Sequence, residues 1–563
     1  MSQRSGAAWL LPLGASLAPP IVLSSWWWGW SDPATRLSWL GWLLYWWMPL
    51  TLVYAGLCAV WRLRAREASV ASLARAWWPG AALALVGLAA VFFASPPGLR
   101  VQFDETCLVG VSQNMHAQGH AVLTTGAIPF EGRPFPLENM VDKRPPLFAY
   151  LCSLVHEVAG YQVSNAFVVN GALLFVGLFA AFAAARARLG LLAGLAAPLL
   201  LLAVPLTGVV ATSAGFELLA VVLLLLATLA ALDFVARPDA PRLAALAGSS
   251  ALLVQSRYES LPAAALLLLL AFSAVRGRLR CSAQARWLLA ALPALAAPLL
   301  LLLDHASDPN FTPEAAGRAL LSVGHFFDHV SAFGAGMFAP GLDNPLPGLV
   351  AALAVVAVAL RLRARQATRR DLLVALPPVS ITVVVLAWFY GDAADPTAMR
   401  LFLPFSWLCA LTPLALVRAL PNRGPQLVLL TAAVLAPMRL GELAAGRAFP
   451  ILDMAALTDA LDGVVRRLPG APGRTLWIGA GAQHLIVNGH AAVSVRTFER
   501  LGPRVEQLRR QGDLGALYLI ETPIDRDMAP ALGAPRDLLR RYPSEVVQRV
   551  GGKMPVTVHR LGR

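Results

Sequence analysis

The chain has 563 residues, of which 57% are hydrophobic and 14% are charged, and its mean hydropathy is +0.62. A soluble protein of this size needs more polar surface, so the composition predicts a polytopic membrane protein. The formal net charge is +14, but the arginines stand in short clusters between apolar runs, as the positive-inside rule predicts. The charge therefore does not indicate nucleic-acid binding.

Apolar runs long enough to cross a bilayer recur at 7–30, 76–97, 163–185, 190–211, 214–235, 286–303, 372–390, 401–418 and 425–440. Helices are the predicted form of these runs, because a helix satisfies its own backbone in lipid. Threading the spans between the arginine clusters gives about thirteen helices, provided that 243–256 and 259–275 form a pair of short helices. The predicted fold is a mainly α, multi-pass bundle with its amino terminus inside the cell and its carboxyl terminus outside.

This topology predicts four parts: N-terminal membrane spans in 1–97, a first large outer loop in 98–162, a membrane core in 163–442, and a C-terminal domain in 443–563. The C-terminal part changes composition. Strands are predicted at 475–479 and 516–520, with a helix over 503–511 between them. We expect a small α/β domain outside the membrane.

The first outer loop carries charge at both of its ends. Asp104 and Glu105 follow a span, and Asp142, Lys143 and Arg144 precede a Pro-Pro that opens the next apolar helix. Adjacent carboxylates at this position can act as a general base, bind a cation, or solvate a helix start. The basic pair can hold an anionic headgroup or extend to the membrane interface as ordinary lysine and arginine side chains do.

Two further places combine polar side chains with membrane context. Arg257 and Glu259 lie in the short helix pair, where they either line a cavity with Tyr258 or simply pair with each other. Tyr390 comes shortly before Arg400 and can shape a sugar site, although aromatic residues are also expected at a membrane boundary.

At this point the chain resembles the C-type (GT-C) membrane glycosyltransferases, in particular the bacterial aminoarabinose transferase and protein mannosyltransferase group. Three short motifs carry the resemblance over about 100–440: the Asp104-Glu105 pair, the stretch from Asp142 to Leu147, and the stretch from Met399 to Pro404. The family usually has Lys-Pro-Pro in the second motif, whereas here Arg144 stands between Lys143 and Pro145.

The resemblance implies roles for individual residues. Asp104 matches the catalytic acid and Glu105 its neighbour. Lys143 and Arg400, with Arg144 beside them, match basic groups that face the phosphate of a lipid donor. His325, in the second outer loop, resembles a family histidine that shares a metal ion with the acid before the lysine, here Asp142. The resemblance leaves open whether the protein uses a divalent metal ion.

The resemblance also implies an activity: transfer of a monosaccharide from a polyprenyl-phosphate donor to an envelope lipid such as lipopolysaccharide, a glycan or a protein. The implied location is the bacterial inner membrane, with the active site on the periplasmic face and membrane lipids around it. Two alternatives remain. One is a lipid or solute transporter, although the chain shows no internal repeat of the kind such proteins have; the other is a non-catalytic glycan-binding protein.

Overall fold

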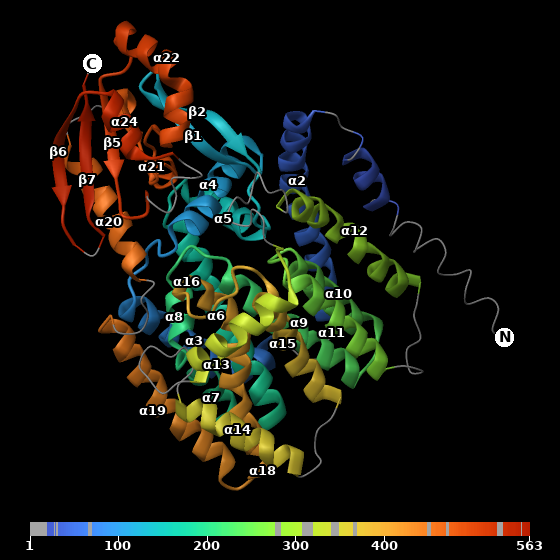
Figure 1. The fold of residues 1–563 in the computed structure, drawn as a ribbon. Coiled ribbons are helices and arrows are strands. Elements are labelled where there is room, and N and C mark those ends of the chain that lie inside the picture. The colour runs from blue at the N-terminus through green and yellow to red at the C-terminus, as the bar shows by residue number, and fades with distance from the viewer. Residues whose placement is uncertain are drawn as a thin grey trace.

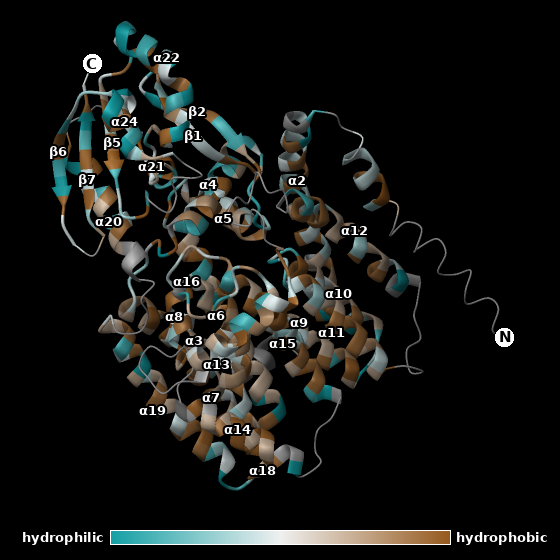
Figure 2. Ribbon diagram, viewed as in Figure 1, coloured by the Kyte–Doolittle hydropathy of each residue, from teal (hydrophilic) through white to brown (hydrophobic). Residues whose placement is uncertain are grey.

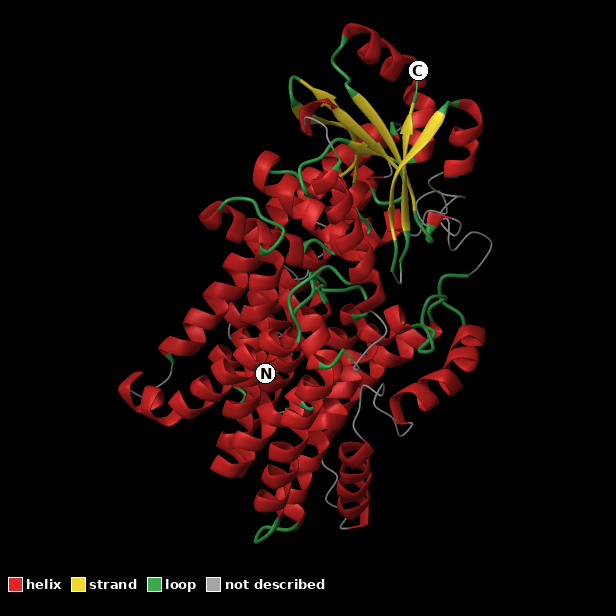
Figure 3. Ribbon diagram, turned by 90° about the vertical axis from the view of Figure 1, so that its left-hand side faces the viewer, coloured by secondary structure: helices red, strands yellow, loops and turns green. Residues whose placement is uncertain are grey.

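The computed structural model describes residues 18, 20–27, 29, 32–65, 70–275, 283–306, 319–338, 348–363, 369–446, 452–468, 472–525, 533–552 and 554–562. A helical bundle forms most of the molecule, and a sheet region lies at one end of it (Figures 1 and 3). Apolar residues dominate the bundle and polar residues the sheet region (Figure 2). We call the end of the bundle that adjoins the sheets the sheet end. Residues 7–17 of the first predicted span lie outside the described part.

Eight described helices are long and apolar enough to cross a membrane. They are α2 (Pro33–Arg64), α3 (Val70–Ala94), α6 (Asn165–Leu189), α9 (Glu217–Ala236), α12 (Ala283–Ala306), α15 (Arg369–Ala387), the segment Thr397–Ala419, and α19 (Gly424–Ala444). The multi-pass bundle is therefore confirmed, but the count of thirteen spans is not. The predicted short pair forms α10 (Ala240–Val254) and α11 (Ser260–Ala274), which have 15 residues each.

The predicted span at 190–211 is broken. It forms α7 (Leu191–Leu202) and α8 (Pro205–Ala211), whose axes differ by 71°. Val204 precedes a proline and has extended backbone angles, because the proline ring disfavours the helical region for the residue before it. If the bent pair counts as one span, the described part has up to nine spans. The break also directs the end of α8 toward the sheet end.

The predicted first outer loop folds into two helices and a hairpin. Helix α4 (Gln102–Gln118) packs against α5 (Leu147–Ala159), and strands β1 (Leu123–Phe130) and β2 (Arg133–Met140) connect them. The hairpin was not predicted, because Pro134 and Pro136 interrupt a strand pattern. Both prolines are tolerated because β2 is an edge strand, and the turn places Glu131 and Gly132 at positive φ, as a tight two-residue hairpin requires.

The C-terminal part contains a five-stranded mixed sheet in the order β4-β3-β5-β7-β6. Its elements are α20 (Leu452–Arg467), β3 (Thr475–Ile478), α21 (Ala482–Val487), β4 (Ala492–Val493), α22 (Val495–Gln511), β5 (Ala516–Glu521), α24 (Pro535–Arg541), β6 (Ser544–Val550) and β7 (Val556–Leu561). Both predicted strands are confirmed. The predicted helix begins earlier, at Val495, because the hydroxyl of Ser494 accepts a hydrogen bond from Thr497 N and caps it.

The sheet region is anchored on the loop that carries the charged motifs. Cys107 Sγ donates to Gln483 Oε1 at 3.2 Å, and Tyr161 Oη donates to the carbonyl oxygen of Val487 at 2.7 Å. Ile128 of the hairpin is buried in the same apolar cluster as residues of the C-terminal sheet. The C-terminal part therefore supports α4, on which Asp104 lies.

The bundle also depends on close helix contacts. A Cβ added at Gly248 of α10 would lie 2.8 Å from the Cβ of Cys58 and 3.2 Å from the Cα of Ala55, both on α2. We expect Gly248→Leu to lower the free energy of unfolding by about 1–3 kcal/mol, because the two helices must separate. Thermal unfolding of the purified protein in detergent measures the change. Gly56→Leu is the control, since nothing lies within 4 Å of its Cβ position, and equal stability of the two variants would contradict this packing.

Candidate active site

The site begins at the amino end of α4, where a buried carboxylate organises the helix start. The residue before the helix, Val101, makes no side-chain cap, and Glu105 Oε2 instead accepts a hydrogen bond from Arg100 N at 2.8 Å. Glu105 is 1% exposed. A carboxylate in the first turn also interacts favourably with the helix dipole. The contacts of Glu105 therefore position the helix that presents Asp104.

Arg100 ties this helix start to the bundle. It is buried, and its Nη2 donates to Ser95 Oγ at 2.7 Å, to Pro96 O at 2.9 Å, and to Thr212 Oγ1 at 2.7 Å. Thr212 follows α8, so the break in the predicted span supplies this partner. Sequence reasoning did not single out Arg100; its signal is an arginine close to the end of an apolar run on the predicted outer side.

Asp104 lies between two arginines that are distant in sequence. Arg144 Nη2 forms an ion pair with Asp104 Oδ1, and Arg400 Nη2 with Asp104 Oδ2. Arg144 lies in the loop before α5, and Arg400 begins the short helix η2 (Arg400–Phe402), which follows α16 (Pro396–Met399). The Asp104 side chain remains 27% exposed, so an incoming ligand can reach it.

The contacts continue into the bundle as a connected series of ion pairs. Arg400 Nη1 lies 2.9 Å from Glu217 Oε1, Arg257 Nη1 lies 3.5 Å from the same oxygen, and Arg257 Nη2 lies 2.8 Å from Glu259 Oε1. Arg144 Nη1 also lies 2.6 Å from Asp142 Oδ1. We call this set the charge cluster; its members are Asp104, Asp142, Arg144, Glu217, Arg257, Glu259 and Arg400.

Glu217 joins the two halves of the charge cluster, and sequence reasoning missed it. It is 3% exposed and begins α9, so that an acid opens a long apolar run. A charge at the end of a membrane helix is a signal of function, but a single acid at a helix start has the simpler explanation of dipole stabilisation. Its contacts with Arg257 and Arg400, which lie on other elements, favour a functional charge over simple stabilisation of the helix dipole.

Two buried polar atoms of the charge cluster have no hydrogen-bond partner among the described residues: Arg400 Nη1 and Asp142 Oδ2. The Arg400 group is near Glu217 without being aligned with it, so their contact is an ion pair and not a hydrogen bond. Buried donors usually find an acceptor. An arginine N–H that lacks one, beside a partly exposed carboxylate, can donate to a phosphate oxygen.

The other predicted site residues lie around this centre. Tyr258 Oη donates to the main-chain carbonyl of Lys143 and so holds the basic loop. Tyr390 Oη lies 2.6 Å from Thr397 Oγ1, and Arg400 Nε donates to Thr397 O at 2.9 Å. Arg257 and Glu259 were predicted either to pair or to line a cavity, and the structure shows the pair.

The residues predicted to share a metal are not in contact in the structure. Asp142 contacts Arg144, whereas His325 Nε2 bonds to Ala319 O at 3.0 Å. A different histidine, His305, lies beside this segment, with its Nε2 3.3 Å from Val141 O. Within the described ranges, no group of three or more His, Cys, Asp or Glu residues could hold a metal ion. Metal sites need more donors than Asp142 alone.

Glu105 has an unusual acidity with a measurable consequence. Burial raises its pKa from 4.5 to about 7, against the hydrogen bond from Arg100 N. The folded protein then holds a proton that the unfolded chain releases above pH 4.5, so this contribution to stability is present below that pH and disappears as pH rises through about 7. Between pH 4.5 and about 7, we expect the free energy of unfolding of wild type to fall by about 3 kcal/mol at most relative to that of Glu105→Gln. Parallel pH–stability curves for the two proteins would contradict the shift.

Removal of Glu217 leaves two buried arginines without their shared partner. We expect Glu217→Gln to lower the free energy of unfolding by about 1–3 kcal/mol, because each arginine loses one buried carboxylate contact and keeps another, Arg257 with Glu259 and Arg400 with Asp104. Glu157→Gln is the matched control, because the Glu157 side chain is 57% exposed and its partner His116 is partly exposed. Denaturant titration in detergent compares the two, and equal effects would show that the charge cluster does not stabilise the fold.

No family model and no curated protein matches the chain. Several solved structures match it. Among them is ArnT from Cupriavidus metallidurans in the apo state, at 15% identity and a TM-score of 0.53, covering 86% of this chain and 98% of that one. Another is the same protein bound to undecaprenyl phosphate, at 14% identity and a TM-score of 0.50, covering 84% and 97%. The predicted resemblance is confirmed for the fold: this chain is folded like the GT-C aminoarabinose transferase ArnT.

Proposed function

We propose that the protein is an integral membrane glycosyltransferase that moves a monosaccharide from a polyprenyl-phosphate donor to an envelope lipid, glycan or protein. We assign the sheet end to the periplasmic face of the bacterial inner membrane. The proposal rests on the position of Asp104, whose partly exposed carboxylate forms ion pairs with both Arg144 and Arg400. It lies in a fold shared with an ArnT structure that contains undecaprenyl phosphate.

The donor phosphate binds where Asp104 now meets the arginines. Guanidinium groups donate hydrogen bonds to phosphate and to carboxylate in the same bidentate geometry, so the two anions compete for Arg144 and Arg400. Arg400 Nη1, which has no hydrogen-bond acceptor among the described residues, supplies an additional donor. Lys143, next to Arg144 in the chain, adds a further positive charge.

The same competition prepares Asp104 for catalysis. As the phosphate takes the arginines, the carboxylate loses its ion pairs and becomes a stronger base toward an acceptor hydroxyl. The acceptor oxygen forms a bond to the anomeric carbon, the bond from that carbon to the phosphate oxygen breaks, and Asp104 takes the hydroxyl proton. The polyprenyl phosphate leaves with the bonding electrons, and Arg144, Arg400 and Lys143 stabilise its charge. A phosphate acceptor would need no base.

The remaining residues position this centre. Glu105 holds the start of α4, so we assign it a positioning role beside the catalytic Asp104. Arg257 and Glu259 pair with each other and, through Glu217, support Arg400. Tyr258 holds the loop that carries Lys143. Tyr390 contacts Thr397, close to Arg400, and we place it beside the sugar. Asp142 orients Arg144 through their ion pair. Among the described residues, the donors around Asp142 are too few to hold a metal ion.

The proposal is tested by a comparison of envelope lipids, glycans and glycoproteins by mass spectrometry. Cells that lack the gene are complemented with wild type, Asp104→Asn or Asp513→Asn. We expect wild type to restore a product heavier by one monosaccharide residue, and Asp104→Asn to lower its amount by about 10²–10⁴-fold, as loss of a general base does.

Asp513 is an exposed acid of the C-terminal part, so its variant controls for the loss of a carboxylate. We expect it to restore wild-type product. Thermal unfolding of each purified variant confirms that it is folded. Wild-type product levels with Asp104→Asn would remove Asp104 from the reaction.

A further inference from the structure

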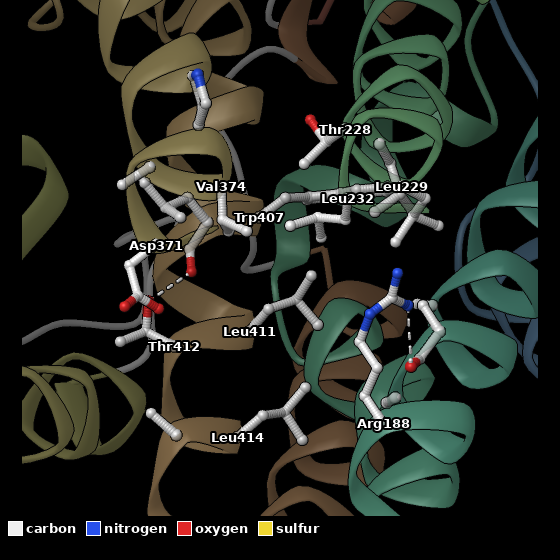
Figure 4. Close-up of a pocket in the computed structure, with 18 of the residues that line it drawn as sticks. Arg188, Thr228, Leu229, Leu232, Asp371, Val374, Trp407, Leu411, Thr412 and Leu414 are labelled. Carbon is white, nitrogen blue, oxygen red and sulfur yellow. Dashed lines mark hydrogen bonds between the residues drawn. The ribbon is translucent and has the colours of Figure 1, made fainter. Parts of the chain in front are cut away.

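A cavity lies in the bundle, far from Asp104. It has a volume of about 470 Å³ and is lined by α6, α9, α15, α14 (Gly348–Arg363), α17 (Leu403–Leu411) and the helical turns that follow α17. This volume is within the range of roughly 300–1,000 Å³ that is typical of ligand sites. Figure 4 shows Leu229, Leu232 and Trp407 around the cavity, with Arg188 and Asp371 on opposite sides of it.

The cavity lies toward the end of the bundle opposite the sheet end, and we call its part near Arg188 and Arg418 the mouth. Helix α9 begins at Glu217 in the charge cluster and reaches Leu232, in the cavity wall, about 22 Å further along. The wall on α9 runs from Val221 to Leu232, a length of about 16 Å. One leaflet contributes about 15 Å of hydrocarbon. The cavity is therefore as deep as one leaflet.

Its walls and its mouth differ in chemistry. Alanines on α6, among them Ala181, Ala184 and Ala185, leave the space open, and apolar side chains form most of the walls. Trp407 is fixed in the inner wall because its Nε1 donates to Thr207 Oγ1 at 2.9 Å. An apolar cavity of this kind in a membrane protein accommodates a hydrocarbon chain.

The mouth carries a positive excess. Arg188 and Arg418 line it, and Arg370 lies close enough to interact electrostatically with Arg188. Neither Arg188, Arg370 nor Arg418 forms an ion pair within the described residues, whereas nearby Asp233 already contacts Arg62 at 2.8 Å and Arg242 at 3.2 Å. Asp371, at the other side of the mouth, offsets one of the three positive charges.

We propose that this cavity binds one acyl chain of an anionic phospholipid from the leaflet at this end of the bundle, and that Arg188, Arg370 and Arg418 hold its phosphate. Basic pockets between membrane helices recognise acidic lipid headgroups in this way. The depth matches an acyl chain of one leaflet, and the distance from Asp104 separates this lipid from the sugar donor. The site is thus a second lipid site that takes no part in the reaction.

The test uses the full chain in nanodiscs that contain equal amounts of phosphatidylglycerol and phosphatidylcholine. Native mass spectrometry then measures the lipid that stays bound to the released protein. We expect wild type to retain phosphatidylglycerol in preference to phosphatidylcholine. The double variant Arg188→Gln with Arg418→Gln should lose that preference by about 30-fold, since each arginine near an anionic lipid contributes about fivefold.

Two further variants make the result specific. Arg64→Gln removes an exposed arginine at the end of α2, which is not part of the cavity, and should retain lipid as wild type does. Ala184→Phe fills the cavity while the arginines remain, and should lower retention of both lipids.

Three outcomes would overturn the proposal. They are equal retention of the two lipids by wild type, unchanged preference in the double arginine variant, and displacement of phosphatidylglycerol by added undecaprenyl phosphate, which would assign the cavity to the donor tail. None of these depends on whether sugar transfer occurs at Asp104.

Discussion

The carboxylate of Asp104 joins parts of the chain that are almost three hundred residues apart. Its two oxygens meet Arg144, from the loop before α5, and Arg400, from a short helix late in the bundle. Charged groups at the edge of a membrane are costly unless they are paired. The ion pairs therefore decide how α4, the loop before α5 and the Thr397–Ala419 segment fit together, and Glu217 extends the same constraint to Arg257 and Glu259.

In the proposed function, this arrangement lets a structural ion pair become a catalytic site. Arginines that hold a carboxylate in the absence of a ligand would need little reorganisation to hold the phosphate of a donor. Arg144 stands between Lys143 and Pro145 and contacts both Asp104 and Asp142. In our proposal it adds a second guanidinium to the phosphate site.

The sequence supported several predictions and failed on others for physical reasons. Asp104 was recognisable because it forms a pair of acids with Glu105 at the outer end of an apolar run, and Arg400 because its motif resembles one of the GT-C glycosyltransferases. Glu217 and Arg100 were missed because a lone acid at a helix start and a lone arginine after a span each have ordinary explanations. The count of thirteen spans was not confirmed among the described residues, because hydropathy does not distinguish a 15-residue helix from a full crossing. Hydropathy also does not show the break at Pro205. The hairpin at 123–140 was hidden by its prolines, which only an edge strand tolerates.

By itself the sequence determined that this is a multi-pass helical membrane protein with a small α/β region near its carboxyl end, because hydropathy and strand patterns are local properties. It also indicated which charged motifs to examine. The tertiary structure decided which charges meet, which backbone groups Glu105 holds, and that His305 and not His325 lies beside the Asp142 segment. Those contacts join residues from different helices, and their distances depend on how the helices pack, which no local pattern encodes.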